Sequence, residues 1–230
     1  IYNNSVDMMI GQTLLNRYEV EAEAGKGGMG VVYKAHDNLL HRIVAIKFLN
    51  AADLGTSGRA RLLSEARATA QLNHPNIVSV FDAGEVNSEP FIVMEFLEGK
   101  TLRGHQTTSI IDSLTITVQI CSALDHAHAK GVIHRDLKLE NIIITESQAL
   151  KLMDFGLART VDGERLTEEG ALVGTFAYLA PELIQGQTAN ERSDLYALGV
   201  IMYEVFAGTS PFQGTVSAVI DQHLNGAVAA

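Results

Sequence analysis

Apolar positions in the first part of the chain come in short runs that polar turns separate. Residues 31–33 and 43–46 are rich in β-branched residues, and 78–81 and 91–94 combine β-branched with aromatic residues. Runs of this length and composition are typical of strands. The pattern therefore predicts an antiparallel sheet that ends near Glu95.

Helical spacing interrupts this sheet once, in the stretch 57–72, and dominates beyond Gly99. In the first stretch Leu62, Ala66 and Thr69 fall at i, i+4 and i+7, which predicts a helix packed by one face. In the later region, positions spaced by four precede a glycine that stops the helix: Ile116, Ile120, Leu124 and His128, then Gly131.

Short apolar runs and one long apolar stretch complete the second half. The runs at 132–133, 142–144 and 150–152 predict short strands. The stretch 195–206 is apolar on most faces, which predicts a buried central helix. The chain is therefore expected to be α+β, with a small sheet-rich half and a larger, mainly helical half.

Composition is that of a folded enzyme, and its charge narrows the choice of partners. The 230 residues are 47% hydrophobic and 19% charged, enough for one large or bilobal domain. Acidic residues outnumber basic ones by 27 to 17, which gives a formal charge of −10. This argues against nucleic acid as a partner, because binding its backbone needs a basic face. A nucleotide site remains compatible with this charge, since it needs only local amides and one or two cations.

The single cysteine and the lack of long apolar runs indicate the cellular compartment in which the chain is expected. Cys121 is the only cysteine, so no internal disulfide forms, and its apolar helical surroundings predict a buried, inert thiol. No apolar run approaches the roughly 20 residues that span a bilayer, and no secretory signal pattern follows Ile1. We therefore expect a cytoplasmic chain without a membrane segment, although a longer parent could carry an anchor.

Five short motifs, in a fixed order, indicate the chemistry. They are Gly25-Lys26-Gly27-Gly28-Met29-Gly30, Val44-Ala45-Ile46-Lys47, His134-Arg135-Asp136-Leu137-Lys138-Leu139-Glu140-Asn141, Asp154-Phe155-Gly156 and Ala180-Pro181-Glu182. Each is weak alone, but in this order they resemble the signature set of protein kinases. The chain is similar to the bacterial, eukaryotic-like (Hanks-type) serine/threonine protein kinases from about Tyr18 to about Gly226.

The resemblance implies a bilobal fold with a nucleotide cleft between a small antiparallel-sheet lobe and a larger helical lobe. We expect a tail at 1–17, the small lobe at 18–94 and the large lobe at 95–230. Kinases of this kind continue through further helices, so the resemblance implies a large lobe that is truncated at its C-terminal end. The family pairs the glutamate matching Glu182 with a late arginine; only Arg192 follows it here, so we expect a buried carboxylate without its partner.

The first two motifs imply a site for the phosphates of ATP. Gly25, Gly27 and Gly30 lack Cβ atoms, so their hairpin could close over phosphate oxygens, although a glycine-rich hairpin alone is weak evidence. By resemblance Lys47 contacts the phosphates and Glu65 holds it; the alternative for Glu65 is an ordinary surface acid. The resemblance also implies nucleotide contacts by Ala24, Gly25, Lys26, Gly27, Gly28, Met29, Gly30, Val32, Ala45, Met94, Glu95, Leu97 and Ile143.

The third and fourth motifs imply the transfer chemistry. By resemblance Asp136 orients the acceptor hydroxyl, Lys138 offsets charge at the γ-phosphate, and Asn141 and Asp154 bind Mg²⁺. For any one of these residues, turn formation or helix capping is the alternative. The lysine at this offset also goes with serine/threonine specificity, so the expected partners are protein substrates. His134 is expected to pack in the core.

Regulation by phosphorylation is also implied. Arg135 matches an arginine that receives a phosphate from the activation loop. Thr160, Thr167 and Thr175 are the hydroxyl candidates, and Thr167, in mid-loop, is the predicted phosphosite. The alternative is a solvated polar loop without a switching role.

Two other classes of function remain open. One is a non-catalytic module, either a pseudokinase or a fragment that folds poorly, although Lys47, Asp136, Asn141 and Asp154 are all present. The other is a small-molecule kinase, against which the Ala180-Pro181-Glu182 segment counts because it suits peptide docking. Dimerisation is compatible with the sequence, which does not name the substrate.

Overall fold

The computed structural model describes residues 9–27, 30–49, 64–87, 89–105, 107, 109–155 and 176–226. The chain divides into two compact units. The N-terminal unit comprises 1–73 and 78–98, and the C-terminal unit comprises 74–77 and 99–230. The main division thus falls after Glu98, four residues beyond the sequence expectation, and each unit is described below by itself.

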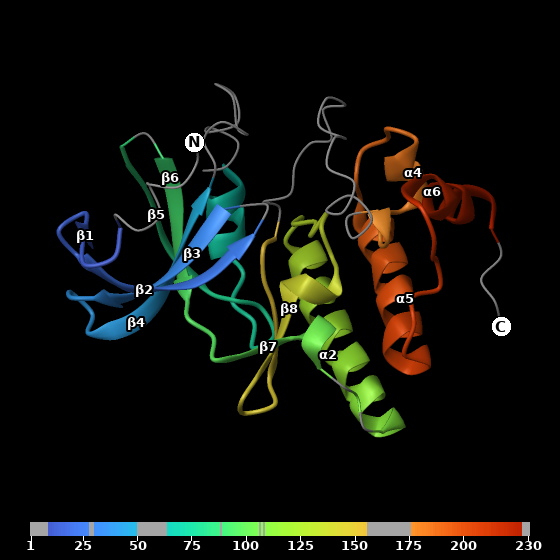
Figure 1. Cartoon of the computed structure of the whole chain (residues 1–230), viewed down its shortest axis with the longest axis horizontal. Helices are drawn as coiled ribbons and strands as arrows, with labels where there is room; N and C mark the ends of the chain where they lie inside the picture. Colours follow the sequence, from blue (N-terminus) through green and yellow to red (C-terminus); the bar gives the residue numbers. More distant parts are fainter. Residues whose placement is uncertain are drawn as a thin grey trace. The chain divides into compact units, whose positions relative to one another are not determined.

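The N-terminal unit is built on an antiparallel sheet of six strands in the order β1-β2-β3-β4-β6-β5 (Figure 1). The strands are β1 (Thr13–Leu14), β2 (Tyr18–Gly27), β3 (Gly30–Asp37), β4 (Arg42–Leu49), β5 (Val80–Val86) and β6 (Glu89–Glu95). Residues 64–70 are helical, inside the predicted helix, and the earlier part of that prediction lies outside the described residues. The predicted antiparallel sheet with one helix is confirmed in this part of the chain.

One face of the sheet carries the hydrophobic core of this unit. Because side chains alternate along a strand, every second residue of β3 and β4 points to this face. Tyr33 and Phe48 meet edge to face with ring centroids 5.8 Å apart, and Phe48 also lies 5.4 Å from Phe91. The core members are Met9, Leu14, Tyr18, Val20, Tyr33, Ala35, Val44, Ile46, Phe48, Phe91 and Val93.

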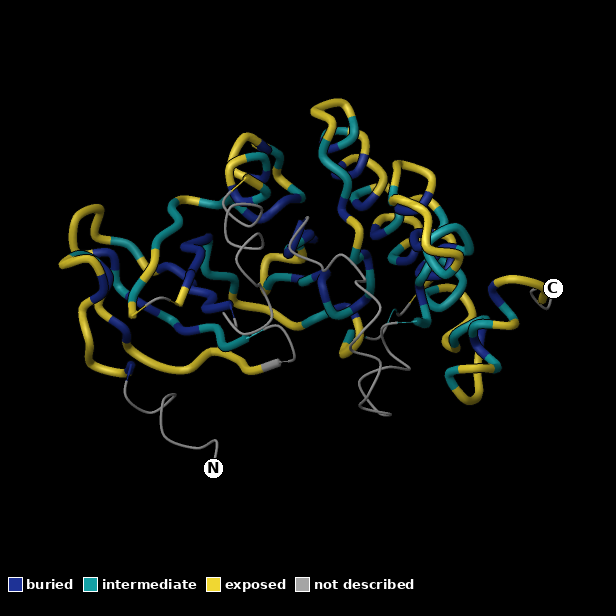
Figure 2. The backbone as a smooth tube through the Cα atoms, turned by 90° about the horizontal axis from the view of Figure 1, so that it is seen from above, coloured by how far each residue is buried: buried dark blue, intermediate teal, exposed yellow. Residues whose placement is uncertain are grey.

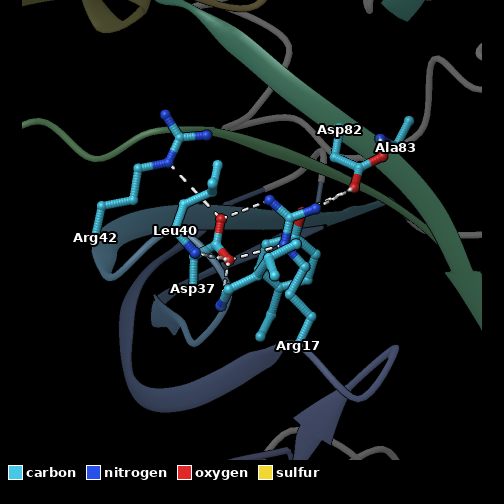
Figure 3. A network of polar contacts seen from close by, with 8 residues as sticks. Arg17, Asp37, Leu40, Arg42, Asp82 and Ala83 are labelled. Atoms are coloured by element: carbon cyan, nitrogen blue, oxygen red, sulfur yellow. Dashed lines mark hydrogen bonds and ion pairs between the residues drawn. The ribbon is translucent and has the colours of Figure 1, made fainter.

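A polar network closes the end of the sheet where β3 turns into β4 (Figure 3). The Asp37 side chain is 1% exposed and accepts hydrogen bonds from Arg17 Nε at 2.8 Å and Nη2 at 2.7 Å. It also accepts from the main-chain N–H groups of Leu39 and Leu40. The hydrogen bond from Arg17 holds the pKa of Asp37 well below its usual range. Asp82, on β5, accepts the hydroxyl of Tyr18 at 2.8 Å.

The C-terminal unit combines a small sheet with helices (Figure 1). Its antiparallel sheet has the order β7-β8-β9, from β7 (Gly99–Thr101), β8 (Ile142–Thr145) and β9 (Leu150–Leu152). Its helices are η2 (Leu102–Gly104), α2 (Ile110–Ala129), η3 (Leu139–Asn141), α4 (Pro181–Ile184), α5 (Glu191–Ala207) and α6 (Val216–Asn225). The predicted strand at 132–133 is wrong, because these two residues belong to no strand among the described residues.

Helix α2 shows which part of the helical pattern was interpreted correctly. Its predicted stripe is buried at Ile116, Ile120 and Leu124, and Gly131 ends the helical region with a φ of 72°. The prediction for Cys121 is wrong, because that residue is exposed. One residue along a helix is a rotation of about 100°, which takes Cys121 from the buried stripe to the outer face.

Helix α5 begins with a capping box and ends at a left-handed glycine. The Asn190 side chain accepts from the N–H of Arg192, and Gly208 has a φ of 75°. Its inner residues are buried, but Leu195 and Phe206 are 54% and 42% exposed, so one side of the helix faces solvent. Figure 2 shows the same mixture of buried and exposed residues along the helical segments of the chain. No helix in the described ranges has both the length and the apolar character needed to cross a bilayer.

Candidate active site

The β2–β3 hairpin of the N-terminal unit supplies the glycine-rich motif. Ala24, Gly25 and Lys26 are exposed near its tip, and Gly25 pairs with Val32. Gly30 has a φ of 131°, and a Cβ atom built there would lie 1.9 Å from the carbonyl oxygen of Phe48. Only glycine therefore fits this position. Gly28 and Met29 lie outside the described residues, and Gly27 is the last residue of β2.

Strand register brings four of the predicted nucleotide residues to one face of the sheet. Val32 pairs with Lys47, and Ala45 pairs with Met94, so these four side chains share a face. It is the face opposite the hydrophobic core. Lys47 is 6% exposed, Met94 is 8% exposed and Val32 is half-buried. A buried lysine on this face is suited to a nearby anion, because an opposite charge offsets the cost of burying an ammonium group.

Two further predicted residues of this unit lie where they could support the site. Glu65 is half-buried in the helix at 64–70, and Thr69 donates to the Glu65 carbonyl at 2.9 Å. Its pairing with Lys47 stays a prediction. Glu95 ends β6; its N–H donates to the Ser79 carbonyl at 2.9 Å, and its carboxylate accepts from the Ser79 N–H at 3.3 Å. The predicted partner Leu97 follows two residues later and is half-buried.

The predicted catalytic residues of the C-terminal unit converge on one carboxylate. Lys138 Nζ lies 2.7 Å from Asp136 Oδ2. Asn141 Nδ2 donates to the same Oδ2 and to the Asp136 carbonyl, both at 2.8 Å. The structure thus brings together three of the residues that the motif predicted. Ile143 follows on β8 and is half-buried.

Asp194, from the first turn of α5, holds the backbone of the loop at 134–141, which is called the catalytic loop below after its predicted role. Its carboxylate accepts from the N–H of His134 at 2.8 Å, from the N–H of Arg135 at 3.0 Å, and from His128 Nε2 at 2.7 Å. Asp194 is 1% exposed. Arg135 has a φ of 68°, a left-handed conformation that costs about 1–2 kcal/mol for a residue with a side chain. Two of these hydrogen bonds join the loop backbone to the carboxylate, and they offset that strain and fix the loop.

The sequence analysis assigned no role to Asp194. The sequence did contain a signal for it. An aspartate in the first turn of an apolar helix is buried only where polar partners receive its charge, so such partners could have been expected. The partners themselves are about 60 residues away in sequence, so no local pattern could name them.

His134 and Asp154 are both buried, and both lie next to Phe155. His134 is fully buried, its ring lies 4.4 Å from that of Phe155, and burial lowers its pKa. Its predicted role as a core residue is confirmed. Asp154 is 7% exposed and has a φ of 64°, so the predicted metal ligand is held in a left-handed turn next to the buried Phe155.

The catalytic loop and the segment before α4 together line one pocket. Its lining includes Asp136 and Lys138 from the loop, and Tyr178, Leu179 and Ala180 from that segment. Because these residues face the same space, a side chain bound against 178–180 would lie next to Asp136. We call this the acceptor pocket.

One arginine connects the wall of the acceptor pocket to the catalytic loop. Arg103 Nε bonds to Glu140 at 2.8 Å, and Nη2 donates to the Tyr178 hydroxyl at 2.5 Å. Arg103 also pairs with Glu204 on α5, which accepts the Tyr178 hydroxyl at 2.7 Å. Burial and then the bond to Glu204 raise the pKa of Tyr178, so the phenol remains a donor. The sequence assigned none of these four residues a role.

The expectation for Glu182 needs correction. Glu182 is half-buried, not fully buried, and it accepts the Ser193 hydroxyl at 2.6 Å. A local hydroxyl therefore serves this carboxylate. The predicted phosphosite Thr167, with Thr160 and Thr175, lies outside the described residues.

The glycine-rich hairpin with Lys47, in the first unit, and the loop with Asp136, in the second, are features of an enzyme domain of the protein kinase type. The chain belongs to the protein kinase domain family, which matches residues 18–228. This confirms the expected α+β class, with an antiparallel-sheet part and a mainly helical part, and the family suggested by the five motifs. Members of this family use ATP and divalent metal ions.

Curated relatives are bacterial serine/threonine-protein kinases. The chain is 39% identical over 219 residues to "Probable serine/threonine-protein kinase PknB" of Lactococcus lactis, which covers 93% of this chain and 35% of that protein. It is 43% identical over 226 residues to PknB of Mycolicibacterium smegmatis, covering 93% and 36%. It is also 43% identical over 213 residues to PknB of Mycobacterium tuberculosis, covering 87% and 34%. The chain thus spans about a third of the length of the relatives it matches.

Proposed function

We propose that this chain transfers the γ-phosphate of ATP to serine or threonine hydroxyls of protein substrates, with Mg²⁺. The observation that carries the proposal is the convergence of Lys138 and Asn141 on a single oxygen of Asp136. Family membership and the names of the relatives support the reaction class.

The carboxylate of Asp136 suits the handling of an acceptor hydroxyl. Both side-chain partners bind Oδ2, and within the described part of the chain no side chain bonds to Oδ1. Oδ1 is therefore the oxygen that can accept the hydroxyl proton, and the two contacts at Oδ2 fix its direction. Lys138 Nζ places a positive charge next to the same carboxylate. This suits phosphoryl transfer, in which negative charge develops on the phosphate oxygens.

The donor set fits a magnesium ion held by few protein ligands. Asn141 Nδ2 donates to a carbonyl and a carboxylate, so the amide orientation is fixed and its oxygen points away from Asp136, where it can act as an acceptor. Asp154 supplies a carboxylate. Mg²⁺ prefers such hard oxygens and completes its shell with phosphate oxygens and water. No group of three or more acidic, histidine or cysteine ligands occurs in the described ranges. When bound, the metal neutralises charge on the phosphates.

The sheet face of the N-terminal unit suits the nucleotide. We assign the phosphates to Lys47 and the glycine hairpin, with Glu65 holding Lys47, and the adenine to Val32, Ala45 and Met94 with Ile143. Because the Glu95 N–H is already used by Ser79, a bond from Glu95 to the base would come from its carbonyl.

Regulation is part of the proposal. Arg135 follows His134 in the catalytic loop, and its main-chain N–H is held by Asp194. Its guanidinium is the charged group that would receive a phosphate on Thr167. This assignment rests on the resemblance and on the fixed backbone of Arg135.

A transfer assay decides between the kinase and a non-catalytic module. The chain is incubated with radiolabelled ATP, Mg²⁺ and a generic basic protein, beside Asp136→Asn and the exposed-surface control Asp125→Asn. We expect labelled phosphoserine or phosphothreonine with the parent and the control, and a loss of more than about 100-fold with Asp136→Asn. ATP binding by calorimetry without any transfer by the parent would favour a pseudokinase.

A further inference from the structure

Strand β9 (Leu150–Leu152) is the edge strand of the sheet β7-β8-β9, and it ends two residues before Asp154. The Thr145 N–H donates to the Ala149 carbonyl at 2.9 Å, so the pairing with β8 begins at Ala149. Because main-chain groups alternate in direction along an antiparallel strand, those of Leu150 and Leu152 point to the outer edge. Both residues are fully buried, so these groups need partners within the protein.

Two side-chain amides take the place of a neighbouring strand along this edge. The Leu150 N–H donates to Gln119 Oε1 at 3.0 Å, and Asn76 Nδ2 donates to the Leu150 carbonyl at 2.9 Å. The two amides are joined, because Asn76 Nδ2 also donates to Gln119 Oε1 at 2.9 Å. The main-chain carbonyl of Asn76 accepts the Leu152 N–H at 2.8 Å. We call the side chains of Gln119 and Asn76 the amide clamp.

Both members of the amide clamp have support of their own. Gln119 lies on α2, the helix that packs against β9 within the C-terminal unit. One turn further along α2, Ser122 Oγ lies 3.1 Å from His74 Nε2, and His74 Nδ1 accepts the Asn76 N–H at 3.1 Å. Helix α2 therefore holds the segment 74–76 at two points, through Gln119 and through Ser122.

The strand that the amide clamp holds leads to both predicted magnesium ligands. Met153 is the first residue after β9, and its N–H donates to the Asn141 carbonyl at 3.0 Å. Asp154 follows directly, in its left-handed conformation. One main-chain hydrogen bond therefore joins the segments that carry the two ligands. A displacement of β9 would change the separation of Asn141 and Asp154, and Mg²⁺ tolerates little change because it demands near-ideal octahedral geometry.

We propose that Gln119 is a positioning residue for the metal site, because its oxygen holds β9 where Asn141 and Asp154 keep the spacing that Mg²⁺ needs. It acts on the binding of the metal with its nucleotide and not on the protein acceptor. The proposal rests on the proposed kinase function for the identity of the metal. The five motifs include neither Gln119 nor Asn76.

Amide exchange tests the positioning without any bound ligand. Hydrogen–deuterium exchange at Leu150 and Met153 is compared among the parent, Gln119→Met, Gln119→Glu and Gln187→Met, which makes the same chemical change at an exposed glutamine of the same unit. Gln119→Met removes the acceptor and keeps the length of the side chain, so we expect exchange at least fivefold faster at both amides. Faster exchange at Leu150 alone would show only the loss of one hydrogen bond and would overturn the proposal, as would parental exchange at both.

The conservative variant separates the acceptor oxygen from packing. Gln119→Glu keeps an oxygen that can accept both N–H donors, so exchange at Leu150 and Met153 should stay within twofold of the parent, as in Gln187→Met. Exchange in Gln119→Glu as fast as in Gln119→Met would overturn the proposal. If Gln119→Met does not fold, Asn76→Ala removes the other amide, keeps the main-chain carbonyl at that position, and should accelerate exchange at Met153 in the same way.

Metal binding then connects the position of β9 with the site. Mn²⁺, which takes oxygen ligands as Mg²⁺ does, is titrated in the presence of a non-hydrolysable ATP analogue, and the free ion is followed by electron paramagnetic resonance. We expect the dissociation constant for Mn²⁺ to rise at least fivefold in Gln119→Met and to stay within twofold in Gln119→Glu. Binding of the analogue alone, in excess chelator, should stay within twofold in both.

The outcomes distinguish this proposal from the proposed function. An unchanged Mn²⁺ constant in Gln119→Met, or an equal loss of analogue binding with and without the metal, would overturn the role of Gln119. A parent that transfers no phosphate contradicts the proposed function alone, because amide exchange and Mn²⁺ binding decide the role of Gln119 without any transfer.

Discussion

Replacing Asp194 by asparagine should both destabilise the chain and slow transfer, because the exchange removes one acceptor that the buried loop cannot replace. The aspartate receives two N–H groups at Oδ2, from His128 and His134, and one at Oδ1, from Arg135. An asparagine amide has a single oxygen. If that oxygen takes the Oδ1 place, the NH₂ group faces the His134 N–H; if it takes the Oδ2 place, the NH₂ group faces the Arg135 N–H.

The magnitude follows from this count. His128 can adapt by changing its tautomer, but a main-chain N–H cannot. One main-chain donor is therefore orphaned in either orientation, and it is buried at His134 and partly buried at Arg135. Such a group costs about 1–3 kcal/mol. That is a large part of the roughly 5–15 kcal/mol by which a domain is stable, yet it leaves the variant folded at low temperature. Because the loss is at the backbone next to Asp136, we expect kcat to fall roughly 100-fold, the effect of a small misplacement.

Urea unfolding and steady-state phosphorylation measure the two effects. The control is Asp125→Asn, which makes the same chemical change on the exposed face of α2. An unfolding free energy within about 0.5 kcal/mol of the parent, the scatter of a surface substitution, together with an unchanged kcat would refute the assignment of Asp194 as the anchor of the loop.

Three other predictions concern the nucleotide, regulation and pH. Lys47→Met and Asp154→Asn should each abolish transfer while circular dichroism stays parental, because losses at phosphate charge amount to several kcal/mol; activity within tenfold of the parent in either would contradict the kinase assignment. Thr167→Ala should lower activity and Thr167→Glu should keep part of it, with phosphate found at Thr167 by mass spectrometry after incubation with ATP; an unmodified loop and full activity in Thr167→Ala would remove the switch. The pKa of Asp37 is depressed by Arg17, so its contribution is present above the unfolded pKa of about 3.9 and is lost as the pH falls below it. Urea unfolding should therefore show a steeper loss of stability from pH 5 to pH 3 in the parent than in Asp37→Asn, and equal losses would contradict this account.

Elements and residues defined by local pattern could be predicted from the sequence. Strands β3 and β4 follow from β-branched runs, and the buried stripe of α2 follows from four-residue spacing. The loop residues Asp136, Lys138 and Asn141 lie within six positions of one another, so a short motif captured them before their contacts were known.

Faces and partners could not be predicted in the same way. Helix α2 is apolar on its outer side too, where Ile111, Leu114 and Val118 are 70%, 51% and 66% exposed. Apolar character therefore does not identify the buried face, and this is why the interpretation of Cys121 was wrong. Glu182 illustrates the same limit for charge, since its partner Ser193 is set by the way α4 meets α5.

The residues that hold the site come from distant parts of the chain, and this has a consequence for variants. Arg103 alone joins the segment after β7, the catalytic loop through Glu140, the pocket wall through Tyr178 and α5 through Glu204. A guanidinium makes several directed hydrogen bonds at once, which lysine cannot reproduce with a single ammonium. Substitution of Arg103 by lysine, conservative by sequence, should thus loosen three contacts together, whereas a change at exposed Arg192 on the same unit should loosen none of them. The sensitivity of a position in this chain follows from how many segments its side chain connects, and only the folded structure contains that number.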